Sequence, residues 1–282
     1  MLLLVLSGAL FSCMHGTIRL VSGGADATDG LHPFEIAFFR NFFGLVVLVP
    51  LLLNAGLSSL RTNRFSLHMW RAILQVFSML MFFSALSMSP LADVTALSFL
   101  APLFTTVGAI LFLGEKARVR RWTALVIGFA GAMIILRPGF QEVGLGLVLV
   151  LGASAIWGGA MLIIKSLSKT DSSVSIAAYM AILMTPMSLL PALFVWRMPT
   201  GEEFIGLFVI GAFGSIGHVM LAQAFKEAEA TAILPLDFTR LIWAAVVGYL
   251  LFAEVPGIWT WLGGGLIFAA ATYVAYREAQ SR

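Results

Sequence analysis

The chain consists of long apolar runs separated by short breaks in which charges, Gly and Pro collect. About ten runs can cross a bilayer, whose hydrocarbon core needs roughly 20 apolar residues of helix. The runs do not alternate between apolar and polar positions as barrel strands do, so they predict an all-α integral membrane protein. The predicted spans cover residues 2–22, 34–54, 69–89, 92–113, 122–137, 145–166, 173–196, 204–225, 228–252 and 258–276.

Composition supports this fold class and excludes several functions. Of the 282 residues, 60% are hydrophobic and only 11% are charged, against about 25% charged residues in a typical soluble domain. This balance excludes a soluble enzyme, a disordered chain and a nucleic-acid binder. The first run lacks a basic lead-in and a small-residue cleavage site, so we interpret it as a span rather than a signal peptide. The single Cys13 allows no intrachain disulfide and no cysteine metal cluster.

The basic residues predict the orientation. If the N-terminus is cytoplasmic, twelve of the 17 Lys and Arg residues lie on cytoplasmic segments, three lie at the opposite ends, and Arg40 and Arg240 lie within spans. By the positive-inside rule this bias predicts both termini in the cytoplasm and an even number of spans. The expected location is the inner (plasma) membrane.

The two halves of the chain are related. A shift of 139 residues aligns identical residues, namely Leu97, Phe99, Leu111, Glu115, Trp122 and Ala132 with Leu236, Phe238, Leu250, Glu254, Trp261 and Ala271. Five spans per half is an odd number, so the second copy enters the membrane from the opposite side. Such an inverted repeat is typical of transporters with a site at the midplane. The predicted halves are 1–137 and 145–276, with a connecting loop at 138–144 and a cytoplasmic tail at 277–282.

Several segments resemble the EamA-type, ten-helix members of the drug/metabolite transporter superfamily. They are LHPFEIAFFRNFFG (31–44), SPLADVTALSFLAPLFTTVGAILFLGE (89–115), WGGAMLIIKSL (157–167) and EATAILPLDFTRLIWAAVVGYLLFAE (229–254). The resemblance covers essentially the whole chain. It implies a central cavity between helices 1–4 and 6–9, with helices 5 and 10 peripheral. Members of this superfamily carry amino acids, including aromatic ones, and also nucleobase-type metabolites, S-adenosylmethionine or riboflavin.

Charges inside a span are costly and face protein or water. Arg240 lies about 18 Å along the ninth span, near the bilayer centre, and Asp237 shares its helix face. In one interpretation the pair meets a zwitterionic substrate, Arg240 binding a carboxylate and Asp237 an ammonium group. In the other, the two charges neutralise each other and fix the helix.

His218 and Asp237 lie at matching depths in the eighth and ninth spans, so they are candidates for proton coupling. The alternative for His218 is a neutral imidazole bonded to a helix carbonyl. His15 in the first span is a weaker candidate for the same role. Arg40, with Glu35 five residues earlier, is interpreted as an end anchor or gate at the outer surface.

Aromatic side chains at similar depths are candidates for a cavity wall that stacks on flat substrates, although plain packing is the alternative for each. Trp157 is the first of these because Gly158 and Gly159 leave space beside it. The others are Phe82, Phe99, Phe238 and Trp243. Supporting hydroxyls are Ser12, Ser78, Ser98 and Thr105, which also bond helix backbones. Pro102 and Pro235 interrupt the fourth and ninth spans.

The glycines of the outer spans predict close helix contacts, and a homodimer through the fifth and tenth helices is possible beside a monomer. No phosphate loop and no catalytic or metal motif is present, so no cofactor, metal or enzymatic activity is expected. The sequence predicts a secondary transporter, with export of amino acids, including aromatic and apolar ones, as the first choice. The alternative is uptake or exchange of a nucleoside-like or flavin-like metabolite. A solute or ion channel is the alternative from another class.

Overall fold

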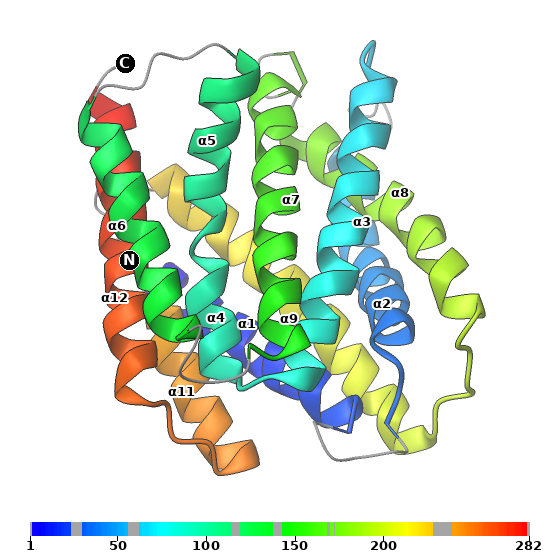
Figure 1. Ribbon diagram of the computed structural model, residues 1–282. Helices are drawn as coiled ribbons and strands as arrows, with labels where there is room; N and C mark the ends of the chain where they lie inside the picture. Colours follow the sequence, from blue (N-terminus) through cyan, green and yellow to red (C-terminus); the bar gives the residue numbers. More distant parts are fainter. Residues whose placement is uncertain are drawn as a thin grey trace.

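The computed structural model describes residues 2–23, 30–55, 62–113, 119–137, 143–167, 170–171, 173–227 and 239–280, and every element within them is a helix (Figure 1). The all-α prediction is therefore confirmed for the described residues. The helices are α1 (Leu2–Val21), α2 (Pro33–Ala55), α3 (Phe65–Met88), α4 (Leu91–Ser98), α5 (Ala101–Leu113), α6 (Val119–Leu136), α7 (Leu145–Leu167), α8 (Ser173–Leu193), α9 (Gly201–Glu227), α11 (Thr239–Phe252) and α12 (Ile258–Gln280).

Each predicted span contains one described helix, or two in the case of the fourth. Six segments are long and apolar enough to cross a membrane, with α4 and α5 counted together, and three shorter helices are also apolar. Large apolar side chains such as Phe112, Val126 and Leu250 are exposed on the outside of the bundle. Such a surface suits contact with lipid tails rather than water.

The fourth span is broken in the middle. α4 ends at Ser98 and α5 begins at Ala101, and the Leu100 N–H bonds the Leu97 carbonyl only three residues back, at 3.0 Å. Pro102 lies in the first turn of α5 and has no N–H to offer the carbonyl of Ser98. The interruption predicted at Pro102 is thus present, and it extends one turn toward the N-terminus. The second predicted interruption, at Pro235, lies outside the described residues.

The helices of the two predicted halves pack in reciprocal pairs. α2 packs on α8, the second spans of the two halves, and α6 packs on α12, the fifth spans, so spans with the same position in each half meet. The contact of α3 with α7 has its counterpart in α1 with α9, and the contact of α5 with α7 has its counterpart in α1 with α11. This exchange is the pattern expected of two halves related by a two-fold axis. The inverted orientation of the halves itself stays a prediction.

Glycines bring the backbones of α6 and α12 together. A Cβ at Gly131 would come 2.7 Å from the carbonyl oxygen of Gly263 and 2.9 Å from Ile267. The close helix contacts predicted from these glycines are therefore made within one chain. A homodimer through the same two helices stays a prediction, but Gly131 and Gly263 are already used between α6 and α12.

We expect Gly131→Ala to destabilise the α6–α12 contact, because the added methyl group meets backbone that cannot move aside. Overpacking of this kind costs roughly 1–3 kcal/mol, which lowers the melting temperature of the detergent-solubilised protein. The matched control is Gly265→Ala, since a Cβ at Gly265 would meet nothing within 4 Å. Equal melting temperatures for the two variants would contradict the role of Gly131 in this contact.

Candidate substrate site

Residues from three parts of the chain meet around Arg240, near the start of α11. Its guanidinium carbon lies 5.8 Å from the centre of the Phe11 ring and 5.6 Å from the centre of the Phe99 ring. The Ser12 hydroxyl donates to the Arg240 carbonyl at 3.2 Å. Gly8 of α1 lies beside Arg240, and a Cβ there would make an ordinary van der Waals contact of 3.7 Å with the Arg240 backbone. We call Phe11, Ser12, Phe99 and Arg240 the central cluster.

The central cluster places a cation against two aromatic faces at the break of the fourth span. A guanidinium within about 6 Å of a ring centre is attracted by the ring quadrupole. Arg240 therefore faces the bundle interior, as both interpretations of the sequence require. Asp237 and Phe238, the predicted partners on the same span, lie outside the described residues.

The two intramembrane histidines border this cluster. The buried His15 ring lies 5.1 Å from the Phe82 ring and within electrostatic reach of Arg240 and His218. His218 donates from Nδ1 to the Gly214 carbonyl at 2.7 Å. This is the helix-bonded alternative that the sequence left open. Proton coupling through His218 stays a prediction.

Arg40 on α2 reaches toward α9. Its guanidinium donates to the Asn41 side chain at 3.0 Å, and a Cβ at Gly214, in the middle of α9, would come 3.3 Å from its Nε. Glu35 instead accepts a hydrogen bond from the backbone N–H of Arg197 at 2.8 Å. The Arg40 side chain thus reaches toward α9, and Glu35 ties two helix ends together. The role of Arg40 as an anchor or gate stays a prediction.

The two predicted tryptophans are half-buried and lie on different helices. Trp157 is on α7, and Trp243 is on α11 one turn beyond Arg240. A Cβ at Gly158 would come 2.9 Å from the backbone nitrogen of Thr105. The space that the sequence predicted beside Trp157 is thus partly occupied by α5. No described contact joins Trp157 to the central cluster.

Two of the predicted hydroxyls donate hydrogen bonds to backbone carbonyls. Ser78 donates to the carbonyl of Ala153 at 2.8 Å, and Ser98 donates to the carbonyl of Thr95 at 2.7 Å. Since each hydroxyl has one proton, neither can donate to a substrate in this arrangement. The structure therefore favours a packing role for Ser78 and a capping role for Ser98 at the end of α4.

One end of the bundle is joined by the carboxylate of Glu254, which precedes α12. Glu254 forms an ion pair with Arg19 and accepts a hydrogen bond from the Leu91 N–H at 3.1 Å. Beside it, Thr260 bonds Asp93. We call these contacts the Glu254 junction.

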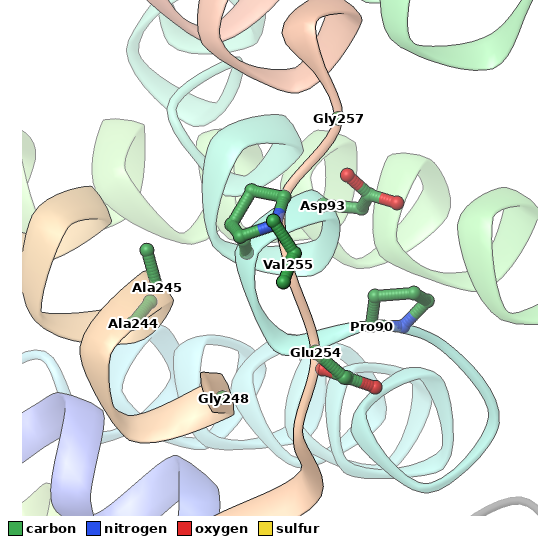
Figure 2. Close-up of a pocket in the computed structure, with 10 residues that line it drawn as sticks. Pro90, Asp93, Ala244, Ala245, Gly248, Glu254, Val255 and Gly257 are labelled. Atoms are coloured by element: carbon green, nitrogen blue, oxygen red, sulfur yellow. The ribbon is translucent and has the colours of Figure 1, made fainter. Parts of the chain in front are cut away.

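A pocket of about 170 Å³ opens at the Glu254 junction, and Figure 2 shows Asp93 and Glu254 among its lining residues. The sequence analysis did not select Asp93. An acidic residue at the second position of the predicted fourth span is the signal that would have found it. The pocket is lined by Pro90, Ala92, Asp93, Ala244, Ala245, Gly248, Glu254, Val255, Pro256 and Gly257.

The segment between α7 and α8 is tied to α3 through Asp171. The His68 ring nitrogen lies 2.7 Å from the Asp171 carboxylate, and both side chains are almost fully buried. Thr62 donates to the same oxygen at 2.7 Å, and Arg64 donates to the Ser166 carbonyl at 3.0 Å. We call these contacts the Asp171 junction. It joins a helix of the first half to a segment of the second.

Hydrogen bonds from His68 and then Thr62 hold the pKa of the Asp171 carboxyl below its ordinary value. A carboxyl whose pKa is depressed in the folded state stabilises the fold above its unfolded pKa of about 3.9. That contribution is lost as the pH falls through the folded-state pKa.

Replacement of Asp171 by Asn should therefore lower the melting temperature at pH 7, because the amide cannot act as the charged acceptor. The expected cost is roughly 1–3 kcal/mol. The difference from the wild type should shrink as the pH falls from about 4, where the carboxyl of the unfolded chain takes up a proton, through the lower pKa of the folded state. Thermal unfolding in detergent over this pH range measures both effects. Glu202→Gln, which changes an exposed carboxylate on α9, is the control, and a pH-independent effect of Asp171→Asn would contradict the assignment.

Known proteins resemble this chain over nearly its whole length. It is 33% identical over 251 residues to an S-adenosylmethionine uptake transporter of Rickettsia felis, covering 89% of this chain and 85% of that protein. It is 33% identical over 283 residues to a riboflavin transporter of Vibrio cholerae, covering 98% and 95%. A pseudopaline exporter of Pseudomonas aeruginosa is 28% identical, covering 95% and 93%.

A solved crystal structure shares the fold. Its TM-score is 0.63 at 16% sequence identity, and the match covers 99% of this chain and 98% of the other. The sequence also matches the EamA-like transporter family over residues 2–137 and 144–276. The predicted superfamily is thereby confirmed, and so is a multi-pass membrane transporter: the chain belongs to the EamA-like transporter family.

Proposed function

We propose that this transporter carries an S-adenosylmethionine-like or riboflavin-like metabolite into the cell. The central cluster is the observation that carries the proposal. Arg240 lies against the Phe11 and Phe99 rings, where aromatic faces and a cation meet in the interior of the bundle. Adenine and isoalloxazine rings are flat and polar at their edges, so they suit stacking on aromatic side chains combined with hydrogen bonds from Arg.

The relatives favour this cargo over the amino acids that the sequence analysis placed first. Two proteins at 33% identity are named for S-adenosylmethionine uptake and for riboflavin transport, which matches the second reading of the sequence. The name of a further relative, a pseudopaline exporter, shows that direction varies among similar proteins. The name of the S-adenosylmethionine uptake transporter supports uptake here.

The two junctions suggest how access alternates. The Glu254 junction joins α1 and α4 to the segment before α12, and the Asp171 junction joins α3 to the segment before α8. Each junction therefore links the two halves of the chain. In our proposal, opening one junction while the other stays closed exposes the central cluster to one side at a time. With both termini in the cytoplasm of an inner-membrane protein, the Asp171 junction faces the cytoplasm.

Counterflow in proteoliposomes tests the function directly. We expect vesicles preloaded with unlabelled S-adenosylmethionine or riboflavin to take up the same labelled compound transiently, because a transporter exchanges solute across its two conformations. A channel would instead dissipate the gradient without exchange and would show unitary currents. Labelled aromatic amino acids are the comparison, and flux of these alone would restore amino-acid transport as the function.

Phe99 offers a test of the central cluster. An aromatic contact contributes about 0.5–1.5 kcal/mol, so Phe99→Leu should raise the KM for the transported compound about 2- to 10-fold. Phe77→Leu removes a ring that is 59% exposed on α3 and should leave the KM unchanged. Equal effects of the two substitutions would show that the cluster does not contact the cargo.

A further inference from the structure

Two polar side chains on α3 are buried against a weak acceptor. Arg71 and Gln75 lie one helical turn apart, and each has less than a tenth of its surface exposed. Arg71 donates from Nη2 to the Met180 sulfur at 3.4 Å, and Gln75 donates from Nε2 to the same sulfur at 3.1 Å. A thioether sulfur accepts hydrogen bonds only weakly. Both donors would form stronger hydrogen bonds if an oxygen acceptor took the place of the sulfur.

Other polar atoms of these two side chains also lack hydrogen-bond partners among the described residues. Arg71 makes one strong bond, to the carbonyl of Ile176 at 2.8 Å. Its Nε and the Gln75 Oε1 are buried with no hydrogen-bond partner among the described residues. Buried polar groups in folded proteins are nearly always bonded, so unpaired atoms of this kind point to a missing ligand or water.

Met180 also lines a small cavity between α2, α8 and α9. The cavity has about 30 Å³, enough for one or two water molecules. Arg40 and His218 line it from the other helices, and His218 lies within electrostatic reach of both Arg40 and Arg71. The flexible side chain of Met180 therefore touches Arg71 and Gln75 and also borders the cavity that holds Arg40.

Arg40 and Arg71 bring positive charge to this part of the bundle, and no carboxylate among the described residues forms an ion pair with either of them. Among the described residues, the ion pairs involve Arg19, His68 and Arg197, and none involves Arg40 or Arg71. Arg40 donates to an amide oxygen of Asn41, and Arg71 to a carbonyl and a sulfur. Two guanidinium groups buried in the bundle are costly without an anion nearby. An arginine fork matches the two oxygens of a carboxylate.

We propose that Arg71, Gln75 and Arg40 form a subsite for a carboxylate of the transported metabolite, which displaces the Met180 sulfur. This inference rests on the proposed function and narrows it. S-adenosylmethionine carries a carboxylate on its amino-acid part, whereas riboflavin carries none. The cargo is then an amino-acid conjugate of a flat ring, with the ring at the central cluster and the carboxylate toward α3 and α8.

A pair of ligands that differ only in the carboxylate tests the subsite. S-adenosylmethionine and its decarboxylated form are compared for binding to the purified protein and for flux into proteoliposomes. We expect the wild type to bind the carboxylate form at least about tenfold more tightly, as charge-assisted bonds to arginine require. Arg71→Gln and Arg40→Gln should reduce that ratio toward one. Arg197→Gln changes an arginine in the segment between α8 and α9, outside the proposed subsite, and should leave the ratio unchanged.

Met180→Leu separates ligand binding from folding. Leucine keeps the apolar volume and removes the sulfur acceptor, so the variant should fold, keep the preference for the carboxylate and bind that form more tightly. A purely structural role for the sulfur predicts a lower melting temperature with no gain in affinity.

The outcomes distinguish this inference from the proposed function. Flux of S-adenosylmethionine without preference over its decarboxylated form, or flux of riboflavin alone, would overturn the carboxylate subsite and leave the transport function intact. Absence of flux for both metabolites would overturn the proposed function, and the subsite would fall with it.

Discussion

Hydrocarbon cannot form hydrogen bonds, and this constraint decides where the bundle places its breaks and charges. The interruption between α4 and α5 is buried, with Phe99 and Leu100 at 6% and 0% exposure. Next to it lies the guanidinium of Arg240, which stacks on Phe99. A helix break and a charge are each costly in lipid, so both are held inside the bundle. The same place is therefore where a polar solute can find partners.

The polar contacts away from the centre bring together residues that are far apart in the chain. Glu254 bonds residues of α1 and α4, and Asp171 bonds residues of α3 and of the segment before it. Both junctions cross from one half of the chain to the other. Their partners are few, and water competes for such bonds more easily at the ends of the bundle than in its middle. This distribution suits the alternating opening of the two junctions proposed above.

Sequence reasoning located the spans because hydropathy follows directly from residue type. It placed Arg240 in the interior because a charge in the middle of an apolar span is costly against lipid. It could not show that the long side chain of Arg40 reaches toward the middle of α9. It also overlooked Gln75 and Met180, because neither residue type is unusual in an apolar span. Their relationship arises only when α3 and α8 pack together.

The sequence by itself determined the helical membrane fold, the number of spans and the family, since each of these depends on residue composition and order along one segment. Only the tertiary structure decided which polar groups meet. The pairing of α1 with α11 placed Phe11 against Arg240, and the pairing of α3 with α8 placed Arg71 on the Met180 sulfur. Such contacts depend on how the helices rotate and tilt against one another, and the order of residues along a single span carries little information about either.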